Sequence, residues 1–305
     1  MGENQNTFNP QFLKMSKIQT IRKSINIKLI RHAESGNNEV YANAHRLFHW
    51  GSDNFDEDGW MEYVKTHRVA DPGLSKRGNV QAEKLAEYLS KRLEEEGSSP
   101  AYFVVSPMQR AVDTIMPTIR MLNENALSKD CDDVCEGAPR CKICVNAYYH
   151  EVEGCHLKNK PHPGMNQIEL ASHINSSSLA TENETFLNDI SFEGFSEVPE
   201  EGWYCHGKGA ENRVDAEKRA STFYMWLCEY LDSQINETGA DDVIDAGVRH
   251  LNSDGSIKKL GRRTVILLGH GEFMGYILKR IMVGFGYTIE HSGVTHRKYV
   301  YTLVE

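Results

Sequence analysis

Short apolar runs and longer segments with helical periodicity follow one another along much of the chain. The run at 25–30, INIKLI, is short and rich in isoleucine, which is typical of a buried strand. Similar runs occur at 101–105 (AYFVV) and 264–268 (TVILL), and the stretch 141–154 can supply another strand. The spacing of these runs predicts a sheet whose strands are far apart in the sequence.

Several of the segments between these runs have the spacing of amphipathic helices. After Ser75, a good N-cap residue, apolar side chains recur at i, i+3, i+4 and i+7, and a second such stripe follows the 264–268 run. The 101–105 run leads straight into a helix, with Ser106 as its N-cap and Pro107 at its first position. The two stripes are Ala82, Leu85, Ala86 and Leu89, and Met274, Ile277, Leu278 and Ile281.

Alternating strands and helices predict a three-layer α/β/α sandwich, in which a mostly parallel central sheet is covered by helices on both faces. A helix at 216–231 fits this plan. Residues 1–23 are polar and aperiodic, so we expect a flexible extension before a domain at 24–305. Three polar, strand-poor regions are expected to be insertions that form a cap or loop region, at about 123–142, 155–210 and 232–262.

The composition narrows the classes of function. A formal charge of −9 argues against a sequence-independent nucleic-acid binder, which would need a basic face. No apolar run approaches the length of a membrane span, and the polar start is not a signal peptide. Seven cysteines without a secretory signal fit a reducing compartment. We therefore expect a cytoplasmic protein that has no nucleic-acid or membrane partner.

Charged and reactive side chains stand where three of the predicted strands end. Arg31 and His32 follow the first run, Arg110 lies in the first turn of the helix after the second, and His270 follows the third. In parallel sheets of this kind, ligands bind outside the carboxyl ends of the strands. Two guanidinium groups and two imidazoles at one edge form an anion pocket, and the planar fork of arginine suits phosphate. Gly271 would let the backbone approach a bound group closely.

Four segments together resemble the histidine phosphatase superfamily, which has the phosphoglycerate mutase-like fold. They are LIRHAESGNN, LSKRGNVQAEKLA, SPMQRAVDT and LLGHGEFMGYIL, and they occur in the order typical of the family. The resemblance covers about residues 25–120 and 213–300, whereas the middle of the chain matches only loosely. It implies a histidine phosphatase domain at 24–305.

The resemblance also implies roles for single residues. His32 would be the nucleophile and would form a phosphohistidine. Arg31, Arg110 and His270 would bind the transferring phosphoryl group, together with Asn38, which matches the phosphate-contacting asparagine of the family motif. This chemistry requires no metal and no other cofactor, because phosphoryl transfer depends on positioning and on stabilising charge.

The sequence departs from the best-known family motif at Ala33, where that motif has glycine. A methyl group is a small addition, so we expect reduced room there without loss of activity.

The leaving alcohol needs a proton donor, which the family takes from an acid after the second arginine motif. The segment YYHEVEG offers Glu151 and Glu153. The family pattern resembles E-x-x-G, which selects Glu151 with Gly154. Glu153 stays an alternative.

Three readings of the function differ in class: a phosphomonoester hydrolase, a phosphoglycerate mutase-type transferase, and a phosphate- or phosphopeptide-binding relative without catalysis. The mutases grip a substrate carboxylate with residues just after the acid, and that grip is not evident here. A pure binder has no need for a nucleophile, so we favour the hydrolase. Its substrate would be a small phosphomonoester, with phosphoproteins left open, as is the oligomeric state.

A separate metal hypothesis rests on the segment CDDVCEGAPRCKIC. Its cysteines could hold a structural zinc ion, although their spacing is unusual. An insertion with scattered free thiols is the alternative that we favour. The four residues are Cys131, Cys135, Cys141 and Cys144.

Overall fold

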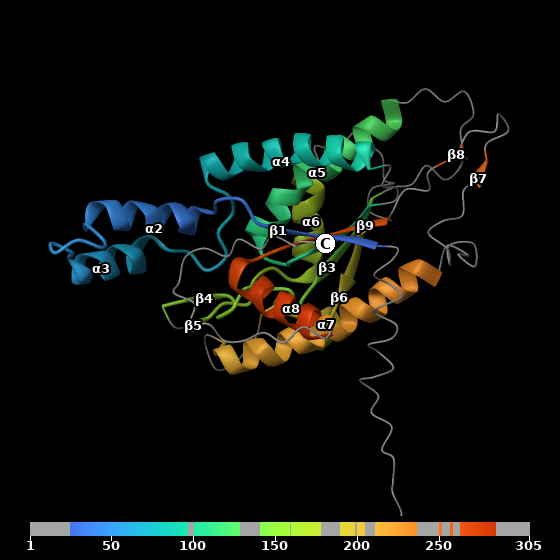
Figure 1. The fold of residues 1–305 in the computed structure, drawn as a ribbon. Helices are drawn as coiled ribbons and strands as arrows, with labels where there is room; N and C mark the ends of the chain where they lie inside the picture. The colour runs from blue at the N-terminus through green and yellow to red at the C-terminus, as the bar shows by residue number, and fades with distance from the viewer. Residues whose placement is uncertain are drawn as a thin grey trace, which may run out of the picture.

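A computed structural model provides the structure of the protein (Figure 1). It describes residues 25–96, 101–128, 141–158, 160–177, 190–198, 200–204, 211–236, 250–251, 257–258 and 263–284.

The centre of the fold is a five-stranded sheet in the order β1-β9-β2-β3-β6. Every neighbouring pair in it is parallel. The sheet confirms the predicted α/β class and the strands expected near 25–30, 101–105 and 264–268. Its strands are β1 (Ile25–Arg31), β2 (Ala101–Val105), β3 (Lys142–Asn146), β6 (Ile190–Glu193) and β9 (Arg263–Gly269).

Helices cover both faces of the sheet, as the sequence predicts (Figure 1). Helices α4 (Lys76–Glu95), α5 (Gln109–Ser128) and α6 (Gln167–Ser177) lie on one face. Helices α7 (Arg213–Asn236) and α8 (Gly271–Gly284) lie on the other.

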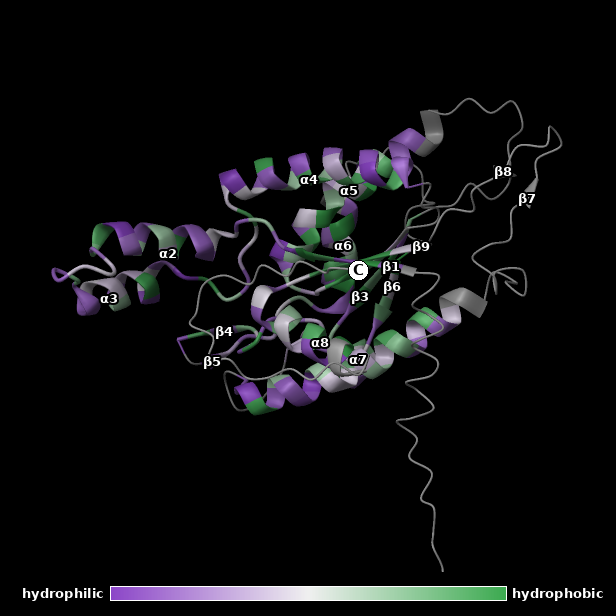
Figure 2. Cartoon of the chain, in the orientation of Figure 1, coloured by the Kyte–Doolittle hydropathy of each residue, from purple (hydrophilic) through white to green (hydrophobic). Residues whose placement is uncertain are grey.

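The central strand β9 shows why the predicted strands are apolar throughout. Ile266 and Leu268 belong to the core beneath α4, α5 and α6, whereas Val265 and Leu267 belong to the core beneath α7 and α8. Figure 2 accordingly colours the strands of the sheet hydrophobic. Burying each of these side chains stabilises the fold by about 1.5–3 kcal/mol, so both helical layers are needed to stabilise the sheet.

Ser75 and the stripe after it behave as predicted. The Ser75 side chain accepts a hydrogen bond from the backbone N–H of Gly78 at 3.0 Å and caps α4. Ala82, Ala86 and Leu89 are buried against α5. Gly78 is required by close packing, because a Cβ there would overlap the backbone carbonyl of Glu34. The loop after β1 therefore rests directly on α4.

Two features differ from the sequence predictions. Helix α5 begins at Gln109 rather than at Pro107, because the Asp71 carboxylate accepts from the N–H of Gln109 and caps the helix there. The region 155–210, expected to be an insertion, supplies α6 and also β6, which extends the main sheet beside β3. This strand was not predicted because its sequence is too polar to read as a buried strand. It lies at an edge of the sheet, where it pairs with a neighbouring strand on one side only.

A helical hairpin of α2 (Gly36–Leu47) and α3 (Glu57–His67) was not predicted and projects from the sandwich (Figure 1). The remaining described elements are short: β4 (His156–Leu157), β5 (Lys160–Pro161), η2 (Phe195–Glu197), β7 (His250–Leu251) and β8 (Ile257–Lys258). Within the described ranges, no helix combines the length and apolarity that a bilayer crossing requires.

Candidate active site

Three neighbouring strands bring the predicted residues to one edge of the sheet. In the parallel register, Arg31 at the end of β1 lies beside Gly269 at the end of β9. The ladder continues one step further, since the N–H of His32 donates to the carbonyl of Gly269 at 2.9 Å. On the other side of β9, the N–H of Ser106 donates to the Leu268 carbonyl at 3.0 Å. His32, Ser106 and His270 therefore follow three adjacent strand ends.

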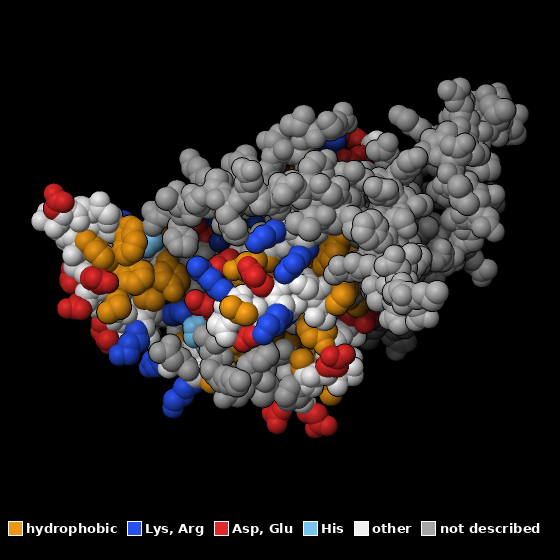
Figure 3. Space-filling view, turned by 60° about the horizontal axis from the view of Figure 1, so that its bottom comes forward, with side chains coloured by type: hydrophobic (Ala, Val, Ile, Leu, Met, Phe, Trp, Pro, Cys, Tyr) orange, Lys and Arg blue, Asp and Glu red, His pale blue; other side chains and the backbone are white. Residues whose placement is uncertain are grey.

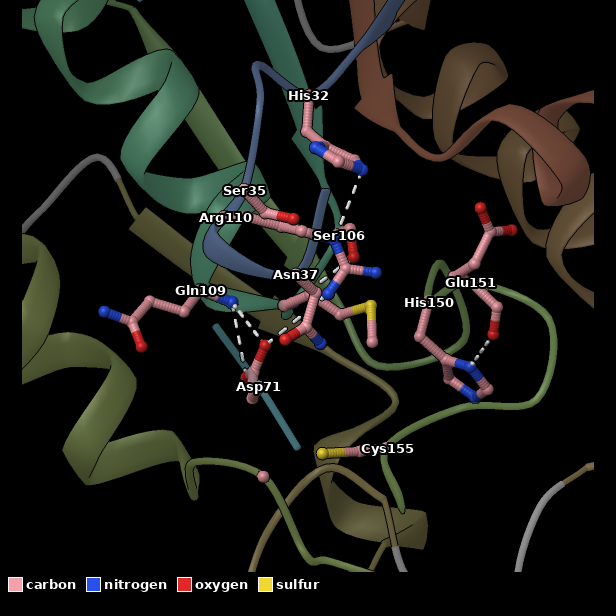
Figure 4. A network of polar contacts seen from close by, with 12 residues as sticks. His32, Ser35, Asn37, Asp71, Ser106, Gln109, Arg110, His150, Glu151 and Cys155 are labelled. Carbon is pink, nitrogen blue, oxygen red and sulfur yellow. Dashed lines mark hydrogen bonds and ion pairs between the residues drawn. The ribbon is translucent and has the colours of Figure 1, made fainter. Parts of the chain in front are cut away.

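The hydrogen bonds of His32 fix its tautomer. Its Nδ1 lies 2.6 Å from the Ala33 carbonyl oxygen, which can only accept, so the proton resides on Nδ1. Its Nε2 is then free to accept, and the Nε–H of Arg110 donates to it at 3.2 Å (Figure 4). The lone pair of Nε2 is thus directed at a guanidinium group, where an anion would bind.

Burial and charge keep the imidazole of His32 neutral. The residue is 8% exposed. Burial and the charges of Arg110 and Arg31 together lower the pKa of His32 to about 3, against the opposing bond to Ala33. An unprotonated nitrogen at neutral pH is what a nucleophilic imidazole requires.

Ala33 takes the place of a glycine without strain. Its φ is not positive, so its methyl group carries no backbone penalty. Its N–H donates to Oγ1 of Thr114 at 3.0 Å, and that hydroxyl donates to the carbonyl of Arg110 at 2.6 Å. These bonds tie the loop of His32 to the helix that carries Arg110.

His270 is fully buried beside His32, with ring centroids 5.0 Å apart. Its Nε2 lies 2.7 Å from Oγ of Ser106, and that hydroxyl already accepts from the N–H of Met108 at 3.2 Å. With Ser106 as the donor to Nε2, the proton of the neutral ring lies on Nδ1. Nδ1 has no hydrogen-bond partner among the described residues. Burial lowers the pKa of His270, and the nearby cations lower it further.

Arg110 is anchored on the side away from His32. Its Nη1 lies 3.9 Å from the carboxylate of Asp71, which also accepts from the N–H of Gln109 (Figure 4). Burial raises the pKa of Asp71 to about 6 against the lowering effect of Arg110. The pair fixes the guanidinium between a structural carboxylate and the candidate nucleophile.

The other predicted anion ligands lie around the same edge. The side chain of Arg31 lies against Gly271, where an added Cβ would be 3.6 Å from the arginine Nε, an ordinary contact. Close packing requires a glycine at Gly269 instead, because a Cβ there would overlap the ring of Tyr149. Asn38 forms a capping box with Ser35, whose N–H donates to Oδ1 of Asn38 at 3.1 Å. These capping bonds occupy its oxygen, so Nδ2 is the atom that could contact an anion.

The two candidate acids occupy different environments. Oε1 of Glu151 accepts from the backbone N–H groups of Val152 at 3.0 Å and Phe273 at 2.9 Å, at the N-terminus of α8. Burial raises the pKa of Glu151, and these bonds and the charge of Arg110 oppose the rise. The side chain of Glu153 is exposed, and its backbone has φ of 69°. The geometry favours Glu151, whose carboxylate lies on the side of the site opposite Asp71 (Figure 4).

Sequence reasoning missed several residues that build the site. Ser106 stands in the quoted segment SPMQRAVDT directly after a predicted strand, which was an available signal, whereas Asp71 lies three residues before the quoted LSKRGNVQAEKLA. Arg219 gave no such signal, because it reaches the site only through tertiary contacts.

A cavity of about 980 Å³ adjoins the site at Asp71 and Gln109. Apolar side chains form part of its wall, including Met165 and Pro163. Three carboxylates and two imidazoles supply its titratable groups, from Asp71, Glu169, Glu201, His162 and His173.

No cluster of metal-ligating side chains occurs among the described residues. In the part of the chain that the structure describes, Cys141 and Cys144 form no disulfide. Cys131 and Cys135 lie outside the described residues, so the zinc hypothesis stays a prediction.

No known protein family profile matches the sequence, and no curated protein matches it. Among solved structures, the chain is similar to the "ecdysone phosphate phosphatase, EPPase, from Bombix mori" in complex with tungstate, with 15% identity over 90% of this chain and 82% of that chain and a TM-score of 0.40. It is also similar to the open reading frame Rv3214 from Mycobacterium tuberculosis, with 13% identity over 87% of this chain and 92% of that chain and a TM-score of 0.35. Both likenesses are remote, so the chemistry has to follow from the side chains themselves.

Proposed function

We propose that this protein is a histidine phosphatase, a phosphomonoester hydrolase that works through a phosphohistidine on His32. The observation that carries the proposal is the fixed tautomer of this histidine. Ala33 holds the proton on Nδ1, and the lone pair on Nε2 meets the Nε–H of Arg110. A binding module would need the cation but not a neutral nucleophilic nitrogen beside it.

In the first step, the phosphoryl group of the ester would take the place beside Arg110. Nε2 of His32 attacks phosphorus, and the bond from phosphorus to the ester oxygen breaks. Glu151 in its protonated form, which burial favours by raising its pKa, gives its proton to the departing oxygen. The products are a free alcohol and a phosphohistidine.

In the second step, the same groups act in reverse. The Glu151 carboxylate takes a proton from water, and the resulting hydroxide attacks phosphorus. The bond from phosphorus to Nε2 breaks, which restores neutral His32 and protonated Glu151. Over both steps, one ester and one water give one alcohol and one inorganic phosphate.

The charge that develops on the phosphoryl oxygens would be stabilised by Arg110 and Arg31, with the buried Nδ1–H of His270 as a further donor. Asn38 would add a hydrogen bond through Nδ2. These groups supply the stabilisation that a metal ion provides in other phosphoryl-transfer sites, so we expect hydrolysis to be independent of metal.

The adjoining cavity bears on the substrate. Its lining contains Asp71, Glu169 and Glu201, so a second phosphate would meet like charge there. We therefore expect small monoesters with an uncharged alcohol to be hydrolysed better than bisphosphates. The exposed lysines near 155–162, by contrast, lie outside this lining.

The test is rapid-quench labelling with a panel of ³²P-phosphomonoesters, with and without EDTA. Acid-labile, base-stable label should accumulate on the wild type in both conditions. His32→Ala should carry none, whereas His67→Ala, which removes an exposed histidine of α3, should be labelled normally. Turnover without label, or label that depends on metal, would contradict the mechanism.

A further inference from the structure

Arg219 lies behind the candidate acid, in the second turn of helix α7. It is 9% exposed and gave no signal in the sequence. Its ion-pair partner is Glu211, whose side chain is 3% exposed. A buried ion pair of this kind is weak evidence for stability, since desolvation offsets the attraction, so its contacts need another explanation.

Each of the five N–H donors of Arg219 makes one hydrogen bond. Nε and Nη2 donate to the two oxygens of Glu211, at 2.8 and 2.6 Å. Nη1 donates to the carbonyls of Tyr148 at 2.7 Å and His150 at 2.9 Å. The second donor of Nη2 reaches the carbonyl of Glu151 at 3.3 Å. One side chain therefore binds the backbone carbonyls of Tyr148, His150 and the candidate acid Glu151.

A second set of contacts fixes the side-chain carboxylate of Glu151. The guanidinium carbon of Arg219 lies 3.9 Å from the ring centroid of Phe273. The N–H of Phe273 donates to Oε1 of Glu151 at 2.9 Å. Arg219 therefore contacts the backbone of Glu151 directly and packs on the residue that binds its side chain.

We propose that Arg219 is a positioning residue for the general acid, and that Glu211 holds it in place and neutralises its charge. The inference rests on the proposed role of Glu151. Lysine cannot replace arginine here, because its ammonium group has three donors and no planar fork. The neutralisation matters because an unpaired cation beside Glu151 would favour the carboxylate and weaken the acid.

The experiment compares Arg219→Lys with wild type on an alkyl phosphate and on 4-nitrophenyl phosphate. Only the alkyl ester needs a proton on its leaving oxygen. We expect kcat for the alkyl ester to fall by about 10- to 100-fold and kcat for the aryl ester to change by less than about threefold. In a Glu151→Gln background, Arg219→Lys should have no further effect on the alkyl ester.

Arg92→Lys is the matched control. Arg92 also pairs with carboxylates, those of Glu95 and Glu96, but on α4 at the other face of the sheet. It should leave the ratio of alkyl to aryl rates unchanged. Equal losses on both esters from Arg219→Lys, or no loss on either, would overturn the inference.

Glu211→Gln gives an independent readout if Arg219→Lys fails to fold by circular dichroism. Gln can keep one bond to the guanidinium group but leaves its charge unpaired, so the pKa of Glu151 should fall. The alkyl rate should then begin to decline at lower pH than in wild type, and an unmoved profile would overturn the inference. A wild type that hydrolyses neither ester, or a Glu151→Gln variant without selectivity, would instead contradict the proposed function.

Discussion

The two halves of the candidate site are held by different kinds of structure. The nucleophile half stands on strand ends: His32 extends the ladder of β1 and β9, and His270 follows β9 directly. The acid half stands on an irregular turn after β3. Glu151 owes its position to Arg219 and Phe273, which are 68 and 122 residues away in the sequence.

The register of the sheet is enough to place the residues of the nucleophile half, whereas only tertiary contacts place the acid. Side chains at strand ends are positioned by backbone hydrogen bonds that the rest of the core protects. The acid depends on a few side-chain contacts. Substitutions in the nucleophile half should therefore abolish chemistry, whereas substitutions around the acid should change which substrates are hydrolysed.

The largest effect is expected from His32→Ala. Without Nε2 no phosphohistidine can form, so kcat should fall by at least about 10⁴-fold for every ester. The measurement is steady-state hydrolysis of alkyl and aryl phosphates, with circular dichroism to confirm folding. Because every ester needs the nucleophile whatever its leaving group, the loss should not depend on the leaving group. A loss that does depend on it would contradict the separation of the two halves.

The convergence of the residues in the nucleophile half could be predicted from the sequence for a physical reason. Arg31, His32 and His270 are polar residues next to apolar runs, and parallel strands must align their carboxyl ends. Their convergence therefore follows from the fold class alone.

The acid half was predicted only through a resemblance, which left Glu151 and Glu153 open. The local sequence does not distinguish Glu151 from Glu153, because the two carboxylates differ in their burial, and that depends on the contact of Glu151 with α8. The hairpin of α2 and α3 was missed altogether. Its hydrophobic side chains partly face solvent instead of forming a stripe (Figure 3), and Leu47, Trp50 and Met61 are between 42% and 51% exposed.

Glu151→Gln should have the next largest effect. Gln keeps the shape and can still accept from Phe273 but cannot protonate an alkoxide. Alkyl phosphate hydrolysis should fall by about 10²- to 10⁴-fold, and hydrolysis of 4-nitrophenyl phosphate much less, since its leaving group is already a weak base. Glu153→Gln is the matched control and should keep both rates. A larger alkyl loss in Glu153→Gln would transfer the role of acid.

The pH dependence should separate the halves in the same way. Glu151 acts when protonated, and burial raises its pKa, so alkyl hydrolysis should decline as pH rises through that value. His32 acts when neutral, and its pKa of about 3 keeps it so down to mildly acidic pH. Profiles of kcat against pH should therefore show a basic limb for alkyl esters that is absent in Glu151→Gln. A basic limb that persists in this variant would assign it to another group.

A smaller effect is expected from Asp71→Asn, which tests how firmly the nucleophile half is anchored. Asn can still accept from the N–H of Gln109, but it removes the charge that faces Arg110 at 3.9 Å. A less fixed guanidinium group should lower kcat/KM by about 10-fold, well below the loss from removing the donor itself. Both ester classes should suffer equally, because the acid half is untouched. A loss confined to alkyl esters would show that Asp71 acts through Glu151 instead.

The smallest effect is expected from Glu153→Gly, in the turn that carries the acid. Glu153 has φ of 69°, a left-handed conformation that costs a residue with a Cβ roughly 1–2 kcal/mol. Glycine removes this cost but loses more backbone entropy on folding, by about 0.5–1 kcal/mol. The free energy of unfolding should therefore rise by no more than about 1.5 kcal/mol, as measured by urea denaturation. Because the side chain is exposed and Arg219 holds the preceding carbonyls, both ester rates should stay within about twofold of wild type. A selective fall in alkyl hydrolysis would show that the turn, and not the hydrogen bonds from Arg219, positions Glu151.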